Sequence, residues 1–138
     1  MAHFDRLHDE HHVLGRKLKY SGDVRFWSTY PPTNKEYRAL PDPPPTNPSY
    51  LKHGGIIARL ELLDALVSFA YALWCKDYGR RIFSSLATID PFLQWCRSKW
   101  TKDLVTDDAE RALVGLMCVS ALCNSVALNQ VLTRMCSD

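Results

Sequence analysis

Prolines are concentrated in one part of the chain, where seven of the eight lie between Pro31 and Pro48. Proline lacks a backbone N–H and biases the residue before it towards extended backbone, so a helix is not expected in this stretch. Large aromatic residues are spaced through and around it: Phe26, Trp27, Tyr30, Tyr37 and Tyr50. Rings interleaved with prolines favour an ordered segment over a free linker. We therefore predict an extended, proline-rich strap over residues 21–53, lying on the helical body of the chain or on a partner.

Outside the strap, apolar residues recur with the period of an α-helix, and no segment alternates with the period of a strand. The N-terminal helix is predicted within residues 1–20, with one narrow apolar stripe from Phe4 to Leu18. The Gly54-Gly55 pair is expected to break the chain before a helical core over residues 54–138. We predict a single all-α domain over residues 1–138, a small helical bundle of about four helices with the strap between the first and second.

Three helices are predicted in the core. The second helix, over about residues 56–78, is apolar around a wide arc and is therefore expected at the centre of the bundle. The third covers about residues 80–100, and its apolar stripe keeps one phase across Pro91, which favours one kinked helix. Asp90-Pro91 also fits a helix start, with an N-cap and a proline in the first turn. The fourth helix is predicted over about residues 107–135, opened by a capping-box pattern.

Composition limits the classes of protein to which this chain can belong. It has 138 residues, of which 46% are hydrophobic and 23% charged, as in a folded globular domain. The formal net charge of +2 is too small to argue for nucleic acid or an anionic membrane. The uncharged stretch over residues 112–133 is long enough to span a bilayer, but its five Ser, Asn and Gln residues favour a core helix. We expect no membrane span.

The cysteines indicate a reducing compartment. Their number is odd and no pair has C-x-x-C spacing: Cys75, Cys96, Cys118, Cys123 and Cys136. Each lies in or beside an apolar helical pattern, where a free thiol behaves as a small hydrophobe. The N-terminus is charged, so no signal peptide is predicted. We expect reduced thiols in the nucleus, with the cytoplasm as the alternative.

No pattern in the sequence marks a catalytic, cofactor or metal site. His8 and His12 lie four residues apart on one helix face, a spacing that can bind a divalent metal, but the H-E-x-x-H order is absent. No residues surround a cysteine as an activated nucleophile requires, and no phosphate-binding or dinucleotide-binding glycine motif occurs. We predict that the protein is not an enzyme and uses no cofactor or metal.

Two further patterns leave alternatives open. Basic residues form small clusters, some near tryptophans that could stack on bases: Arg16, Lys17, Lys19, Arg80, Arg81, Arg97, Lys99 and Lys102. A nucleic-acid-binding module is therefore the alternative function, although solvated helix faces explain such clusters equally. The strap contains two P-x-x-P patterns and one N-P-x-Y pattern, which are also common in turns.

The remaining positive evidence for a function is apolar surface. Two helices are apolar around much of their girth, and four tryptophans are available in a small domain. Such faces either meet one another in a monomeric core or mark a protein interface, where Trp, Tyr and Arg dominate. We predict a protein-binding or homodimerising module, with a helical partner as the other possibility. The expected contact residues are Leu66, Phe69, Leu73, Trp74, Phe92, Trp95 and Trp100.

Four segments resemble one known module, in order and rough spacing. They are LGRKLKYSGD from Leu14 to Asp23, LDALVSFAYA from Leu63 to Ala72, and the stretches 83–93 and 109–122. Together they are similar to the C-terminal homology domain of the AF-four/fragile-X-E family, the scaffold proteins of the super elongation complex. The chain departs from that pattern at the strap and lacks the later helices. The resemblance implies a nuclear, all-helical dimerisation module in transcription elongation.

Overall fold

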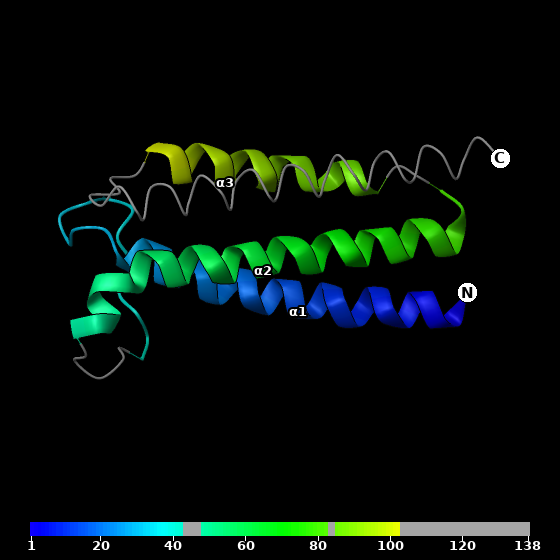
Figure 1. The fold of residues 1–138 in the computed structure, drawn as a ribbon, viewed down its shortest axis with the longest axis horizontal. Helices are drawn as coiled ribbons and strands as arrows, with labels where there is room; N and C mark the ends of the chain where they lie inside the picture. Colours follow the sequence, from blue (N-terminus) through cyan, green and yellow to red (C-terminus); the bar gives the residue numbers. More distant parts are fainter. Residues whose placement is uncertain (43–47, 83–84, 103–138) are drawn as a thin grey trace.

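The computed structural model describes residues 1–42, 48–82 and 85–102 (Figure 1). The described residues form the helices α1 (Ala2–Ser28), α2 (Pro48–Arg80) and α3 (Asp90–Lys102), with the short 3-10 helix η1 (Leu86–Ile89) before α3. No strand occurs in this part of the chain, which confirms the all-α prediction. The predicted fourth helix over residues 107–135 lies outside the described residues, as do its uncharged stretch and three of the cysteines.

The middle helix α2 has a neighbour on each side. Figure 1 shows α1 and α2 running antiparallel along most of their length, while α3 lies on the other side of α2 and runs back antiparallel to it. The central position predicted for the second helix is thus observed within the described part of the chain. None of the described helices is both long and apolar enough to cross a membrane.

The first helix is longer than predicted, because α1 continues from the expected end at Tyr20 to Ser28. The helix ends where Thr29 donates its hydroxyl to the Phe26 carbonyl at 2.7 Å, just before the first two prolines. The residues from 21 to 28 are helical because Phe26, 1% exposed, packs into the core. The prediction that the strap began at residue 21 is therefore wrong.

The second helix also starts earlier, because α2 begins at Pro48 and passes through Gly54-Gly55 without a break. Proline is compatible with the first helical position, where its missing N–H would have no partner in the helix. The predicted break at the glycine pair is wrong. In the part of the strap that is described, residues 29–42 contain no helix, and the Arg38 N–H donates to the Trp27 carbonyl at 3.4 Å.

Small residues allow α1 and α2 to lie close together. Gly15 and Gly22 are both buried in α1. A β-carbon at Gly22 would lie 2.8 Å from Leu62 Cγ in α2. On α2, buried alanines recur every seven residues: Ala58, Ala65 and Ala72. Seven residues are close to two helical turns, so these alanines form one row that α1 can approach.

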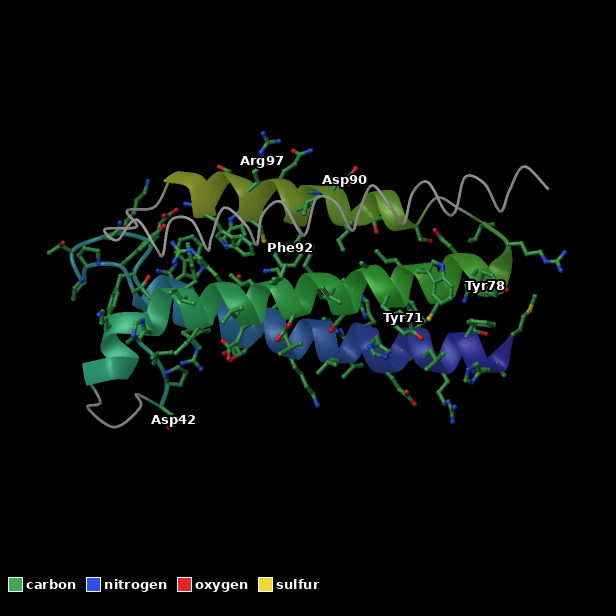
Figure 2. The ribbon with its side chains drawn as sticks, in the orientation of Figure 1. Asp42, Tyr71, Tyr78, Asp90, Phe92 and Arg97 are labelled. Carbon is green, nitrogen blue, oxygen red and sulfur yellow. The ribbon has the colours of Figure 1, made fainter. Side chains whose placement is uncertain are left out.

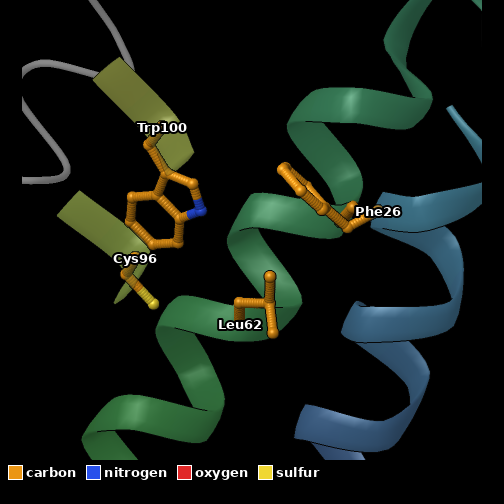
Figure 3. Close-up of a cluster of buried hydrophobic side chains, with 5 residues drawn as sticks. Phe26, Leu62, Cys96 and Trp100 are labelled. Carbon is orange, nitrogen blue, oxygen red and sulfur yellow. The ribbon is translucent and has the colours of Figure 1, made fainter. Parts of the chain in front are cut away.

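A single cluster of buried side chains joins the three helices: Phe26, Ala58, Leu62, Cys96 and Trp100. Figure 3 shows Trp100 of α3 and Phe26 of α1 on either side of Leu62 of α2. A smaller cluster around Leu66 and Ile89 continues the core towards η1. The core therefore depends on residues from both ends of the described chain.

The predicted single kinked helix over residues 80–100 is wrong. The chain leaves α2 through a turn and forms η1, and α3 then begins at Asp90 with Pro91 in its first turn, as in the alternative interpretation. Asp77 explains the break, because this fully buried carboxylate accepts hydrogen bonds from the Ser85 N–H at 3.0 and 3.3 Å. Ile89 of η1 and both Cys96 and Trp100 of α3 are nevertheless buried in the core.

The end of α2 has the hydrogen bonds of a Schellman motif. The Ile82 N–H donates to the Asp77 carbonyl at 3.1 Å, and the Arg81 N–H donates to the Tyr78 carbonyl at 3.4 Å. Arg81 occupies the left-handed position of this motif, with a φ of 53°. Glycine is the usual residue there, since a β-carbon costs roughly 1–2 kcal/mol in that conformation.

Replacing Arg81 by glycine should therefore raise the free energy of unfolding by about 1 kcal/mol. The measurement is the midpoint of urea denaturation, followed by circular dichroism at 222 nm, a standard helix wavelength. Arg81→Ala removes the same charge but keeps the β-carbon, so it should give no gain. Equal stability of the two variants would contradict the conformational explanation.

Candidate functional site

Two of the seven predicted contact residues lie in the core. Trp100 is 2% exposed and Leu66 is 5% exposed. Both pack against other residues of the chain itself, Trp100 in the cluster around Phe26 and Leu66 beside Ile89. A partner could reach these two side chains only if the helices separated.

Four more of the predicted residues are half-buried against the core: Phe69, Leu73, Phe92 and Trp95. Figure 2 shows Phe92 directed from α3 towards α2. Its ring lies 6.2 Å from the ring of Phe69, at an interplanar angle of 81°. These side chains join the helices to one another and present only part of their surface to a partner.

The remaining predicted residue, Trp74, belongs to a surface that the sequence analysis did not recognise. Among the described side chains of α2, four large apolar ones are exposed: Leu60 45%, Val67 53%, Tyr71 39% and Tyr78 39%. With Trp74 they are spaced 7, 4, 3 and 4 residues apart, so they share one helix face. We call these five residues the α2 stripe.

The tyrosines of the α2 stripe are held in place by aromatic stacking. The Trp74 ring lies 5.7 Å from the Tyr71 ring and 5.2 Å from the Tyr78 ring, nearly parallel to each. From α1, His11 contacts Tyr71 at 4.6 Å and Phe4 contacts Tyr78 at 5.0 Å between ring centroids. Figure 2 shows both tyrosines on the C-terminal half of α2, where it runs beside α1. These ring contacts therefore hold the aromatic side chains of the stripe in defined positions.

The spacing contained a signal for this surface. The wide apolar arc predicted for the second helix includes Leu60, Val67 and Trp74, which recur every seven residues. Tyr71 and Tyr78 extend that stripe at helical spacing, and tyrosine is common where one side of a ring is buried and the other is exposed. The helical period gives the face, but it does not say whether another element covers it.

Beneath the stripe lies a cysteine with no sign of activation. Cys75 is fully buried, and this burial raises the pKa of its thiol. A hydrogen bond with the Cys75 side chain raises the pKa of the Tyr71 hydroxyl. A thiol held in its protonated form is a poor nucleophile. Cys75 thus acts as a packing residue at this position.

Two histidines of α1, His11 and His12, pack on aromatic rings of α2. The rings of His8 and His12 are stacked at 5.4 Å, and His12 lies edge-on to Phe69 at 5.5 Å. His8 Nδ1 lies 2.9 Å from the Asp9 carboxylate. In the described part of the chain, no three His, Cys, Asp or Glu side chains converge as a metal would require.

His12 makes the stability of the protein depend on pH. Burial against α2 lowers the pKa of its imidazole below the ordinary 6.5, and the nearby Arg16 and His8 lower it further. As pH falls below 6.5, the unfolded chain takes up a proton at this residue before the folded chain does. Stability that is present above pH 6.5 is therefore lost as pH falls through the lowered pKa of the folded state.

Replacing His12 by glutamine should flatten the pH dependence of stability. Both proteins should lose stability between about pH 7 and about pH 5, but the wild type should lose more, because only it takes up a proton at position 12 on unfolding. The free energy of unfolding is measured by urea denaturation at intervals over this range. Identical slopes for the two proteins would show that His12 does not link protonation to folding.

Basic residues near the tryptophans are already engaged within the chain. Lys19 forms an ion pair with Asp23, and its ammonium lies 5.3 Å from the ring centroid of Phe92 and 5.9 Å from that of Trp95. Cation–π contacts of this kind stabilise the approach of α1 to α3.

A second lysine near a tryptophan, Lys99, connects α3 to the strap. Lys99 forms an ion pair with Glu36 at 3.2 Å and lies 5.1 Å from the ring centroid of Trp27. Neither lysine offers a free charge beside a free ring, which is what base stacking with phosphate contacts would need. This arrangement gives no support to the nucleic-acid alternative at these tryptophans.

Comparisons of the chain with models of protein families, with curated protein sequences and with solved structures find no match.

Proposed function

We propose that this chain is a non-catalytic protein–protein interaction module that homodimerises or binds a helical partner through the α2 stripe. The observation that carries the proposal is the exposure of Leu60, Val67, Tyr71 and Tyr78 on one face of the central helix. An exposed apolar face on a small domain is typical of an interaction site, although Asp64 lies between Leu60 and Val67 on this one. Tyrosine and tryptophan supply large contact area at a small cost in side-chain entropy.

The geometry of the stripe suits a helix as partner. A second helix can place its own apolar residues between those spaced three and four apart, as in antiparallel bundles. The spacing from Leu60 to Tyr78, with Asp64 included, is 4, 3, 4, 3 and 4 residues and is the same in both directions along the helix. In an antiparallel second copy, Leu60 therefore meets Tyr78 and Val67 meets Tyr71, while Asp64 meets Trp74. The two apolar pairings support homodimerisation as the first form to test.

The cellular setting is part of the proposal. The resemblance of four segments to the C-terminal homology domain of the AF-four/fragile-X-E family suggests a nuclear scaffold in transcription elongation. It is compatible with an all-α chain whose exposed apolar surface is suited to assembly rather than to chemistry.

Replacing Val67 by aspartate tests the proposal. The molar mass of the whole chain is measured by light scattering over a dilution series at low and high salt. We expect the wild type to approach twice 15.8 kDa and to keep that mass at high salt, since apolar contacts are weakly screened. A buried, unpaired carboxylate should raise the dissociation constant of the dimer by about 100-fold, equivalent to about 3 kcal/mol.

The matched control is Val13→Asp, at a valine of similar exposure on α1 and away from the stripe. It should leave the mass unchanged. A monomeric wild type would refute homodimerisation and leave a helical partner to be sought. A dimer unaffected by Val67→Asp would place the contact elsewhere, and a dimer that dissociates with salt would point to a charged interface.

A further inference from the structure

A second exposed surface lies on α1 and differs in chemistry from the α2 stripe. Val13 and Tyr20 are 41% and 70% exposed, and Arg16 and Lys17 between them are also exposed. The four residues are spaced 3, 1 and 3 apart, so all lie on one helix face within two turns. We call this set the α1 outer face.

The α1 outer face points away from the rest of the described chain. The opposite face of α1 carries Gly15 and Gly22, where an added β-carbon would lie 2.9 Å from Phe69 and 2.8 Å from Leu62 of α2. Figure 1 shows α2 along only one side of α1. The α1 outer face and the α2 stripe are therefore separate surfaces.

Its two cations stand out among the charges of α1. Three other basic residues of this helix are paired with carboxylates of the chain: Arg6 with Glu10, Lys19 with Asp23, and Arg25 with Glu61. No ion pair within the described residues involves Arg16 or Lys17. Two neighbouring unpaired cations thus lie between two exposed apolar side chains.

We propose that the α1 outer face binds an acidic amphipathic segment of a partner protein. Apolar side chains of that segment would contact Val13 and Tyr20, and its carboxylates would pair with Arg16 and Lys17. The pattern is complementary to a helix with apolar residues at spacings of three and four and acidic residues between them. Charge complementarity of this kind gives specificity and speeds association.

A peptide fits this face better than a nucleic acid. Binding to a nucleic acid depends on several phosphate contacts, and this face offers two cations. Val13 adds nothing to phosphate binding, whereas it can be buried by an apolar side chain of a peptide. The proposal does not depend on the proposed function, because it involves neither the α2 stripe nor the oligomeric state.

The test uses a fluorescein-labelled synthetic peptide with leucines at positions three and four apart and glutamates between them. Fluorescence polarisation measures its affinity for the whole chain and for a variant carrying Arg16→Glu and Lys17→Glu. We expect the double variant to bind the peptide at least about tenfold more weakly. A peptide with lysines in place of the glutamates should prefer the double variant over the wild type, which would locate the ion pairs.

A matched variant, Lys35→Glu with Lys52→Glu, changes the net charge equally at two other exposed lysines. If this control weakened peptide binding as much as the Arg16/Lys17 variant does, the effect would be due to net charge alone, and the proposal would be overturned. It is also overturned if the wild type does not bind the acidic peptide, or if it binds a labelled single-stranded RNA more tightly and loses that binding in the Arg16/Lys17 variant. Loss of peptide binding in Val67→Asp would assign the peptide to the α2 stripe instead.

Discussion

Replacing Phe26 by alanine should lower the free energy of unfolding by about 3–5 kcal/mol. The side chain is 1% exposed and lies in the cluster that joins all three helices. Its ring contacts Trp27, Tyr30 and Trp95 at centroid distances of 5.3, 5.7 and 5.8 Å. Truncation removes these contacts and leaves a cavity between α1 and α2. A loss of this size is a large part of the stability of a domain of this length, so much of the variant should be unfolded at 37 °C, ordinary physiological temperature.

Urea denaturation followed by tryptophan fluorescence measures the effect. The control is Tyr20→Ala, which removes a larger side chain from the same helix at a position that is 70% exposed. That variant should change stability by less than about 0.5 kcal/mol. If Phe26→Ala cost no more than Tyr20→Ala, the helix beyond Tyr20 would not be packed on α2.

Phe26 also shows what limited the prediction of this fold. The all-α class follows from the helical period of the apolar residues and is confirmed by the described helices. Phe26 and Trp27 were assigned to a strap because prolines follow them. Local chemistry excludes a helix only from Pro31 onward. What extends α1 to Ser28 is the burial of Phe26 on α2, a contact between segments distant in sequence that no local pattern reports.

The connection between α2 and α3 was missed for a similar reason. Asp90-Pro91 gave the correct local signal for a helix start, and the continuous phase of the apolar stripe outweighed it. Asp77 explains why the signal was right, because its buried carboxylate binds the Ser85 N–H and turns the chain. The sequence around such an aspartate does not predict that it will be buried and bind a backbone N–H, because that depends on which element packs against it.

The candidate surface was predicted only in part. The sequence identified the central helix and Trp74, but it selected the largest apolar residues as contacts. Of these, Trp100 is 2% exposed. Large apolar side chains are favoured equally in a protein core and in an interface, so size and hydrophobicity do not distinguish core residues from interface residues. Exposure separates them, and it depends on where α1 and α3 lie against α2.

The Gly54-Gly55 pair was predicted to break the chain, whereas Gly22 and Gly54 both lie inside helices, which makes a sharp prediction. Gly22→Ala should destabilise the protein by about 2 kcal/mol, although alanine is intrinsically the better helix former. The added methyl would lie 2.8 Å from Leu62 Cγ and 3.2 Å from the Leu62 backbone nitrogen. Leu62 is fully buried, so relief requires α1 and α2 to move apart.

The same substitution at Gly54 should have the opposite sign. Gly54 lies inside α2, and its nearest neighbour to an added methyl is Thr29 Cγ2 at 3.9 Å, an ordinary contact. Without a clash, Gly54→Ala should stabilise the protein by about 0.4–1 kcal/mol, because the unfolded chain loses conformational freedom. The two variants should therefore differ by about 3 kcal/mol in urea denaturation.

Two identical substitutions with opposite effects distinguish the role of each glycine. If glycine acted at both positions only through its low helix propensity, both variants would be more stable than the wild type. If both variants were less stable than the wild type, Gly54 of α2 would be packed against its neighbours as closely as Gly22 of α1 is packed against α2. The expected pattern requires that α1 pack tightly against α2 at Gly22 and leave room at Gly54. That close packing also brings His11 edge-on to Tyr71 and Phe4 against Tyr78 at a tilt, so the α2 stripe depends on it.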